Sequence, residues 1–417
     1  MTLARALLIA FLLSCLAAGI VAVVSRTPAS VRAMESGVDG SADTFTEVQI
    51  ARHGAYRGPL YLAFGLGLIA EIALFVLLRG AAMDQLTRWM AGIPGGWPAR
   101  AAATGAAVAA SIVVVALPLG YVRGYALQKA WRLSNQDLSA WGLDQVKGAV
   151  ISVVITTIAS VAFFGIVRWQ PRWWWLWGAG TFTVLTAVLV FLYPVLIAPL
   201  FNRFTPLEDA ALSQRIEVVA RRAGVDVDRV LVADASTRSS AENAYVAGLG
   251  ATKQVVLYDT LIAGHDDDET MFVVAHELGH EAEGHVLKGI AVSAVGLLIG
   301  FGALAWLVGS GKLLEWAGVT SLTDLRVVPA LLLFALVAGV VLQPAQNAVS
   351  RSFEATADAI AFDLTGDPVP AVRAFHRLAL ANIADLNPPP LAVWMFYSHP
   401  PISSRIKAAK ASGAFRP

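Results

Sequence analysis

The sequence WWLWGAGTFTVLTAVLVFLYPVL, from Trp174 to Leu196, contains no charged residue. A membrane span needs roughly 20 consecutive apolar residues to cross about 30 Å of hydrocarbon. With Trp173, four tryptophans gather at the start of this stretch, as in the aromatic belts at membrane–water interfaces. The stretch therefore predicts a transmembrane helix and an integral membrane protein.

Six further stretches of similar length and hydropathy lie elsewhere in the chain. In order along the sequence, the seven are Leu3–Ser25, Pro59–Leu78, Ala101–Val122, Ala149–Val167, Trp174–Leu196, Gly289–Val308 and Val328–Val349. They predict a mainly α-helical, polytopic membrane protein with about seven transmembrane helices. Between Arg26 and Gly58 the sequence predicts an extended loop.

Composition agrees with this class of protein. Of 417 residues, 57% are hydrophobic and 15% are charged, and the mean hydropathy is +0.63. Soluble domains carry about 25% charged residues, so an ordinary soluble protein and a disordered chain are both excluded. The formal net charge of +1 gives no basic surface for nucleic acid, and the single cysteine, Cys15, excludes an internal disulfide or a multi-cysteine zinc site.

The first stretch has two interpretations. Its basic start, its apolar run and the residues Leu12–Cys15 would suit a lipoprotein-type signal. Because the apolar run continues past Cys15 as far as Val24, we favour an uncleaved anchor. Loops on the side opposite the amino terminus carry more Lys and Arg, and the positive side is normally cytoplasmic. We therefore expect a multi-pass protein of the cell membrane, surrounded by lipid, with its amino terminus outside and its carboxyl terminus on the cytoplasmic side.

The remaining sequence has the composition of a water-facing domain in two pieces. We expect about five membrane helices in residues 1–200, a soluble portion in residues 201–288, two further membrane helices in residues 289–349 and a second soluble portion in residues 350–417. Within the first soluble portion, the pattern predicts a helix over 207–223 ended by Gly224, and a small sheet. The expected strands are Val230–Val232, Ala244–Ala247 and Val255–Tyr258.

The motif His276-Glu277-Leu278-Gly279-His280 follows an acidic cluster, 266–269, that suits a helix start. Histidines at i and i+4 share one helix face, so both imidazoles can reach one metal ion. Zinc accepts such nitrogens, and the intervening glutamate can take a proton from water. A helix with incidental polar residues is the alternative for this motif alone.

A third ligand is available far along the chain. Glu354 follows an apolar span, and Asp358 lies one helical turn further on the same face. Catalytic zinc sites combine two histidines with a carboxylate, and a second carboxylate holds the free N–H of a ligand histidine. Taken alone, these two acids would suit a solvated helix face; beside the histidine pair we assign Glu354 as a ligand.

With these motifs the chain resembles the zinc-dependent CAAX prenyl protease type I family, also called the a-factor-converting endopeptidase family, in a prokaryotic form. The resemblance runs from about Tyr125 to Ala408. Its matching segments are Leu133–Gln136 with Trp141 and Lys147, Ile197–Leu207, Arg238–Ser240, Asn243–Tyr245, Lys253–Leu261, Ser350–Asp358, Asn382–Pro390, and Tyr397–Pro401 with Arg405 and Ile406.

The resemblance implies seven membrane helices around a water-filled chamber, capped by a zincin-like metalloprotease domain with a small β-sheet. It implies one zinc ion per chain on His276, His280 and Glu354, with Glu277 as the catalytic glutamate. His399 is expected to stabilise the oxyanion and Asp358 to complete the catalytic set. Asn243, Tyr245 and Arg405 are expected to bind substrate, Asn243 on an edge strand that pairs with an extended peptide.

For the remaining arginines and histidines, the sequence supports only general expectations. Arg351 and Arg405 are expected to pair with the carboxylates of the site, with a surface salt bridge as the alternative. His285 is expected to support a ligand rather than to be one. His53, His265 and His376 match nothing catalytic and are expected at the surface.

The predicted activity is hydrolysis of peptide bonds by an integral membrane zinc endopeptidase. In eukaryotes, members of the family that this chain resembles remove the last three residues of prenylated proteins. The expected partner is therefore a peptide or protein substrate, lipid-modified or not. Two alternatives stay open: a membrane quality-control protease of the heat-shock type, which would have fewer spans, and a non-catalytic membrane chamber with structural zinc, which would have a fourth protein ligand.

Overall fold

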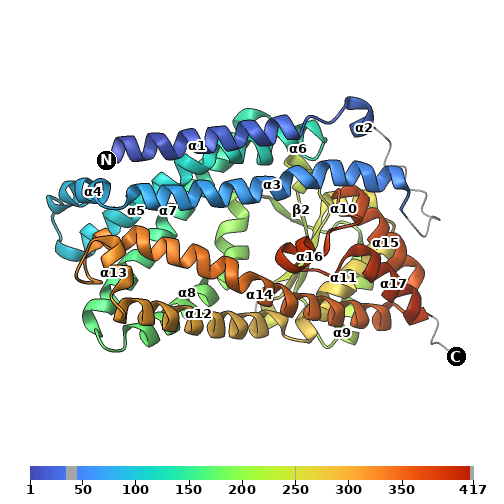
Figure 1. The fold of residues 1–417 in the computed structure, drawn as a ribbon. Coiled ribbons are helices and arrows are strands. Elements are labelled where there is room, and N and C mark those ends of the chain that lie inside the picture. The colour runs from blue at the N-terminus through green and yellow to red at the C-terminus, as the bar shows by residue number, and fades with distance from the viewer. Residues whose placement is uncertain (34–44, 249, 414–417) are drawn as a thin grey trace.

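The computed structural model describes residues 1–33, 45–248 and 250–413. Long helices lie side by side and form the larger portion of the molecule, while the sheet and most short helices gather at one end of them (Figure 1). The amino terminus lies at the opposite end from helix α17 (Ile402–Gly413). The chain thus consists of a helical bundle with a mixed α and β portion at one end.

Among the described residues, seven helical segments are long and apolar enough to cross a membrane. Their helices are α1 (Leu3–Val24), α3 (Glu47–Leu78), α5 (Gly96–Tyr121), α7 (Leu138–Trp169), α8 (Trp174–Leu192), α12 (His285–Gly309) and α14 (Val328–Thr365). Each corresponds to one predicted stretch, so the prediction of a polytopic helical protein is confirmed. Large apolar side chains such as Val341 and Trp306 are exposed on the bundle surface, where lipid would cover them.

Several of these helices are longer than the apolar stretches that predicted them. Helix α3 begins at Glu47, where the Thr46 side chain accepts from the backbone of Gln49 and the Gln49 side chain returns to Thr46. The extended loop expected over 26–58 is therefore wrong for residues 29–33 and 47–58, which are helical. Residues 34–44 lie outside the described residues. Hydropathy marks only the portion inside the bilayer, whereas capping groups such as those of Thr46 and Asp137 set where a helix begins.

A sheet of four strands carries the soluble portion, in the order β1 (Phe204–Pro206), β2 (Arg229–Ala233), β4 (Gln254–Tyr258) and β3 (Ala244–Ala247). Strands β2 and β4 are parallel, and the other two pairs are antiparallel. The three expected strands are present within a residue or two. Strand β1 was not predicted, because three residues that end in proline are too few to show the alternation of apolar and polar side chains typical of a strand.

Helix α11 (Asp267–Ala282) lies at the centre of the second apolar core. Its buried side chains Phe272, Val274 and Leu278 pack with residues of the sheet, of α9 (Ala210–Arg222), of α14 and of α15 (Pro368–Ala381). The other helices are α2 (Ala29–Ala33), α4 (Ala81–Ala91), α6 (Leu127–Ala130), α10 (Asp259–Gly264), α13 (Lys312–Ala317) and α16 (Pro390–Phe396). Short π- and 3₁₀-helical turns are η1 (Val122–Ala126), η2 (Tyr193–Ile197), η3 (Ala198–Leu200), η4 (Ala235–Thr237), η5 (Gly250–Thr252) and η6 (Leu325–Val327).

Helix α14 is continuous over 38 residues and joins the bundle to the soluble portion. The boundary expected between residues 349 and 350 lies inside this helix. A ligand candidate on its far end is thus held by the same element that forms the last candidate span.

Candidate metal centre and active site

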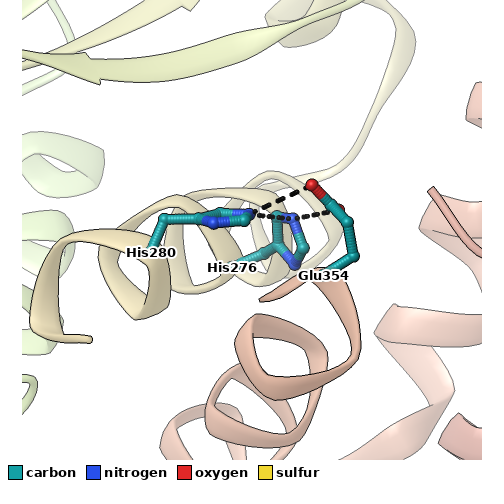
Figure 2. A group of neighbouring side chains, drawn as sticks. All are labelled: His276, His280 and Glu354. Carbon is teal, nitrogen blue, oxygen red and sulfur yellow. Dashed lines mark hydrogen bonds and ion pairs between the residues drawn. The ribbon is translucent and has the colours of Figure 1, made fainter. Parts of the chain in front are cut away.

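The two histidines of the motif lie on one face of α11. The helix begins after Asp266, whose carboxylate accepts from the backbone N–H of Glu269 at 2.9 Å, and acidic residues fill its first turn. Four residues apart, His276 and His280 project side by side toward Glu354, which α14 brings from the opposite side (Figure 2). Two elements distant in sequence therefore meet at these three side chains.

The ligand atoms of the three residues converge. His276 Nε2 lies 3.1 Å from His280 Nε2 and 3.3 Å from Glu354 Oε2, and His280 Nε2 lies 3.5 Å from Glu354 Oε1. One ligand atom from each residue lies within 4.8 Å of the others. Donors about 2.0–2.1 Å from a tetrahedral zinc ion would be separated by about 3.4 Å, close to these values.

Hydrogen-bond accounting also favours a cation here. His276 Nδ1 lies 2.9 Å from Asp358 Oδ1, so this nitrogen donates and, in the neutral ring, Nε2 carries the lone pair. Glu354 Oε2 is buried and has no hydrogen-bond partner. A lone pair and a buried carboxylate oxygen therefore face the same point, and a bound metal ion would satisfy both.

The pKa values of the two histidines agree with this interpretation. Burial would lower the pKa of His276, but the neighbouring carboxylates of Asp358 and Glu354 outweigh it and raise the pKa to about 9. Burial and the neighbouring charge of His276 lower the pKa of His280 to about 4. Without a metal ion, His276 therefore takes up a proton at Nε2, which faces Glu354, and a bound metal ion would take the place of that proton.

Close approach of α11 and α14 depends on Gly279. A Cβ atom there would lie 3.1 Å from the carbonyl oxygen of Ala357, 3.2 Å from its Cα and 3.3 Å from the Cβ of Ile360. These separations are tighter than ordinary contacts, and two of them are to backbone. The absence of a side chain at 279 therefore lets Glu354 come within reach of the histidines.

Glu277 lies beside the ligands at the wall of a cavity of about 340 Å³. The cavity is also lined by Asn243, His399 and Arg405, and its apolar wall includes Phe272 and Phe375. Burial, followed by the nearby charge of Glu354, raises the pKa of Glu277 to about 7. A carboxyl group with that pKa can both accept and release a proton near neutral pH.

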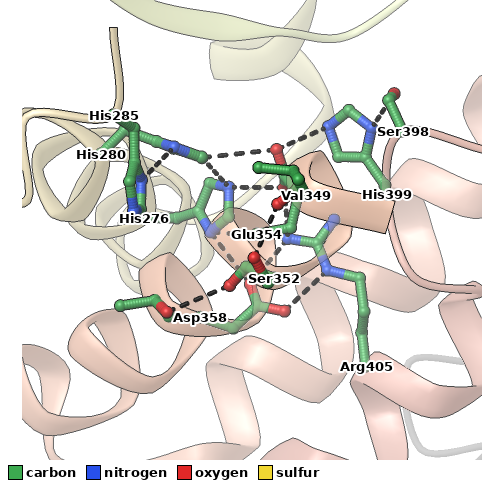
Figure 3. Close-up of polar contacts among 11 residues, drawn as sticks. His276, His280, His285, Val349, Ser352, Glu354, Asp358, Ser398, His399 and Arg405 are labelled. Carbon is green, nitrogen blue, oxygen red and sulfur yellow. Dashed lines mark hydrogen bonds and ion pairs between the residues drawn. The ribbon is translucent and has the colours of Figure 1, made fainter. Parts of the chain in front are cut away.

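Asp358 and Arg405 form a supporting pair next to the histidines (Figure 3). Arg405 donates to Asp358 twice, from Nε at 2.8 Å and from Nη2 at 2.7 Å. Asp358 thus acts through His276, and among the described residues it is not part of the cavity lining. Arg405 pairs with a site carboxylate as expected, and its substrate contact stays a prediction. Arg351 instead donates to the backbone carbonyls of Val393 and Tyr397. The expectation that Arg351 pairs with a carboxylate of the site is therefore wrong.

His399 and His285 flank the ligand group from two sides (Figure 3). His399 Nε2 lies 3.2 Å from Glu354 Oε1, and its exposed ring is held by a contact between Nδ1 and Ser398 Oγ at 2.9 Å. His285 Nδ1 lies 2.9 Å from His280 Nδ1, and its ring stacks on Phe353 at 4.4 Å. His285 therefore contacts a ligand candidate through its far nitrogen, and His399 faces the cavity.

Asn243 leads directly into β3, an edge strand of the sheet. Its carbonyl accepts from the backbone of Tyr258 at 3.0 Å, and the strand pairs on one side only, with β4, among the described residues. The Tyr245 ring meets that of Tyr258 edge-on at 6.5 Å. The free edge of β3 is thus available for backbone pairing close to the cavity.

The three histidines expected at the surface are buried, and that expectation is wrong. The exposed fractions of His53, His265 and His376 are 0%, 8% and 3%. His53 contacts the carbonyl of Ala384, His376 stacks on Phe45, and His265 lies between two carboxylates. Their partners lie in distant segments of the sequence or in loops, which a motif search does not connect.

Sequence reasoning also missed Gly279 as a packing residue, and Glu242 and Asn382 as residues of the cavity wall. Glu242 immediately precedes Asn243, and Asn382 opens the matching segment Asn382–Pro390, so both lie next to a recognisable signal. Gly279 lies inside the histidine motif itself. Each role depends on contact with another segment, which spacing within one motif does not report.

Two family models match the chain. Residues 206–412 match peptidase family M48, and residues 60–203 match the model described as CAAX prenyl protease N-terminal, five membrane helices. The uncharacterized metalloprotease YhfN of Bacillus subtilis (strain 168) is 33% identical over 341 residues, covering 81% of this chain and 79% of YhfN. CAAX prenyl protease 1 of Saccharomyces cerevisiae (strain ATCC 204508 / S288c) is 30% identical over 312 residues, covering 71% and 68%.

A solved structure shares the fold over nearly the whole chain. The crystal structure of S. mikatae Ste24p superposes with a TM-score of 0.76 at 23% sequence identity, covering 97% of this chain and 99% of that one. The expected seven-helix architecture and its soluble portion thus have a counterpart of known structure.

Proposed function

The chain belongs to peptidase family M48 and is a membrane metallopeptidase of the CAAX prenyl protease type, and from that premise we propose that it hydrolyses peptide bonds at the His276–His280–Glu354 centre with one zinc ion per chain. The observation that carries the proposal is the convergence of three ligand atoms within 4.8 Å, beside Glu277. Zinc, when bound, acts as a Lewis acid toward water and the scissile carbonyl.

The roles of the surrounding residues follow from their positions. Glu277 takes the proton of the attacking water and passes it to the departing amine, for which its pKa of about 7 is suited. His399 donates from Nε2 to the oxygen of the tetrahedral intermediate. Asp358, held by Arg405, keeps the His276 ring in the tautomer that leaves Nε2 free to bind the metal.

An extended peptide would bind along the free edge of β3. Backbone pairing fixes the position of the scissile bond independently of side chains. Asn243 lines the cavity, and Tyr245 lies two residues further along, within β3. We propose that lipid-modified peptides are among the substrates, as the name of the yeast relative suggests for that protein. A prenylated and an unprenylated form of one reporter peptide would separate the two cases.

The proposed setting is the cell membrane, with the soluble portion toward the cytoplasm and the amino terminus outside. We also propose four functional regions: a membrane region over residues 1–200, a zinc-helix region over residues 201–288, a pair of spans over residues 289–349 and a carboxyl-terminal region with the third ligand over residues 350–417. Labelling of single cysteines introduced in loops on each side of the bundle would test the orientation.

The deciding experiment is Glu277→Gln in the full-length protein. We expect this variant to fold and to bind zinc while cleavage of a quenched reporter peptide falls by about 10³-fold or more. Glu281→Gln is the matched control, because Glu281 lies one helical turn further on α11 and pairs with Lys253 at 2.8 Å instead of facing the cavity. Turnover retained in Glu277→Gln would contradict the proposal.

A structural zinc site is the competing assignment, and the metal centre itself distinguishes the two. A structural site is closed by four protein ligands. In the described residues, the group able to hold a metal has three members, which leaves a coordination position for water. X-ray absorption showing a fourth protein ligand would favour the structural assignment.

A further inference from the structure

His265 is a buried histidine that the proposed mechanism does not use. Its Nε2 lies 2.9 Å from Glu242 Oε2, and its Nδ1 lies 2.9 Å from Glu269 Oε2. Carboxylates accept, so both ring nitrogens must donate, and only the protonated imidazolium has two N–H groups. The side chain has an exposed fraction of 0%. His265 is therefore a buried cation that bridges two carboxylates.

The groups around His265 balance its charge from every element packed against it. From α15, Arg373 Nε lies 3.2 Å from Glu269 Oε1 and Arg377 Nε lies 3.2 Å from Glu269 Oε2. Asp266, at the start of α11, pairs with Arg373 at 3.2 Å. Three cations thus face three carboxylates, and burial, which alone would lower the pKa of His265, is outweighed by Glu242 and Glu269, which raise it.

One end of this bridge holds the segment that enters the substrate strand. Glu242 immediately precedes Asn243. The Asn382 side chain makes two hydrogen bonds with the Glu242 backbone: it accepts from the Glu242 N–H at 3.1 Å and donates to the Glu242 carbonyl at 3.2 Å. Thr260 donates to the carbonyl of Ala241 at 2.7 Å. A Cβ atom on Gly264 would overlap the Glu242 carboxylate, so the glycine provides its space.

The other end of the bridge holds the zinc helix. Glu269 lies in the first turn of α11, two turns before His276 on the same helix. Its carboxylate has an exposed fraction of 0% and forms ion pairs with Arg373 and Arg377 as well as with His265. A single imidazolium therefore connects the helix that carries the metal ligands to the segment that leads into the edge strand.

We propose that His265 is a positioning residue for peptide hydrolysis, whose imidazolium sets segment 241–247 relative to α11 and so governs substrate binding rather than the chemical step. The inference rests on the proposed function, because it takes β3 as the strand that pairs with substrate. It concerns residues outside the metal ligands and assigns a role to a side chain that does not touch the reacting atoms.

Loss of the proton from His265 would release one end of the bridge. A neutral ring has one N–H, so one carboxylate would face a lone pair. Glu269 is fully enclosed, whereas Glu242 has an exposed fraction of 11% at the wall of the cavity. Glu242 is therefore the carboxylate that turns away, and the segment before Asn243 moves with it.

Kinetics of the full-length protein with a quenched reporter peptide test this role. His265→Gln keeps a donor for only one carboxylate, and we expect KM to rise about tenfold while kcat stays within about twofold. Glu242→Gln can still accept from His265 but removes the charge that raises its pKa. Its KM should therefore begin to rise at a lower pH than the KM of the unmodified protein does.

Arg326→Gln is the matched control. Arg326 also bridges two carboxylates, at 3.0 Å from Asp84 and 2.6 Å from Asp324, but it lies in the α4–η6 region at the opposite end of the bundle. KM should be unchanged in this variant. A fall in kcat at constant KM in His265→Gln, or identical KM–pH profiles for Glu242→Gln and the unmodified protein, would overturn the proposal.

Amide hydrogen exchange gives a readout that does not need activity. We expect faster exchange of residues 241–247 in His265→Gln, and in the unmodified protein when pH rises above the pKa of His265. If the unmodified protein fails to cleave any peptide but shows this exchange, the proposed function is wrong and the bridge stands. Exchange that is unchanged in His265→Gln and independent of pH would refute the bridge alone. If His265→Gln fails to fold, the pH dependence of KM and of amide exchange in Glu242→Gln tests the proposal in its place.

Discussion

Asp358 Oδ1 lies 2.9 Å from His276 Nδ1 while Arg405 holds the same carboxylate through two hydrogen bonds. The imidazole is thereby fixed with its other nitrogen toward Glu354. Ligand histidines held by a carboxylate bind metal more tightly, because the tautomer and ring orientation are already set. The three side chains form one chain of contacts from α17 to the metal centre.

Asp358→Asn should therefore weaken zinc binding while leaving the fold intact. The amide can still accept from His276 but carries no charge, so we expect the zinc dissociation constant to rise about 10- to 100-fold. Titration against a competing chelator measures it. Thr356→Ala is the control, because Thr356 is exposed on the same helix. Equal affinities in Asp358→Asn and the control would show that this carboxylate does not support the ligand.

Gly279→Ala should separate the two helices that assemble the site. A Cβ at this position would meet the backbone of Ala357 at 3.1 and 3.2 Å, and neither helix backbone can give way without moving a ligand. We expect lower zinc content and a loss of stability of about 1–3 kcal/mol. Gly289→Ala, with nothing within 4 Å of its added Cβ, should behave as the unmodified protein. Metal content and thermal unfolding of the two variants check this.

His399→Ala should slow the chemical step without affecting the metal. Removing one donor to a developing oxyanion typically costs about 10²-fold or more in kcat. Zinc content should stay the same, because His399 contacts only Glu354 Oε1 of the ligand set. Lys407→Gln, at an exposed position of α17, is the control for a lost cation. A rise in KM alone would instead assign His399 to substrate binding.

Stability should depend on pH through His265. Its pKa in the folded protein is raised above the ordinary value of about 6.5. A group with a raised folded pKa contributes stability that is complete below its unfolded pKa and is lost as pH rises through its folded pKa. The difference in apparent Tm between the unmodified protein and His265→Gln should thus be largest near pH 6 and shrink on raising pH. Scans at saturating zinc measure it, and a difference that grows with pH would contradict this sign.

The membrane spans and the grouping of His276, His280 and Glu354 could be predicted because their signals are local or periodic. Apolar length alone identifies a span, and the i, i+4 spacing of His276 and His280 places both rings on one face whatever surrounds them. Glu354 could be identified from the sequence because it follows a predicted span within a segment that resembles the family. Each of these features depends on short stretches of sequence.

The errors have a common physical cause, which is long-range contact. His265 has the same local features as an exposed histidine among acidic residues, and only Glu242, from a loop 23 residues earlier, makes it a buried cation. Arg351 lies beside a site carboxylate in sequence, yet the chain folds so that carbonyl groups 42 and 46 residues away take its donors. Pairing of this kind is decided by tertiary packing, which no local pattern contains.

Glu354 lies on the far end of α14, a single helix of 38 residues whose near end is a candidate span. At 1.5 Å per residue this helix is about 57 Å long, nearly twice the thickness of the hydrocarbon layer. Pro344 lies within this helix between its apolar start and Glu354, and an interior proline removes a backbone hydrogen bond and favours a bend. The span and the turns that carry Glu354 are therefore joined through that bend. A change of tilt that fits the span to a thinner or thicker bilayer would thus be taken up at Pro344 before it reaches the turns that carry Glu354.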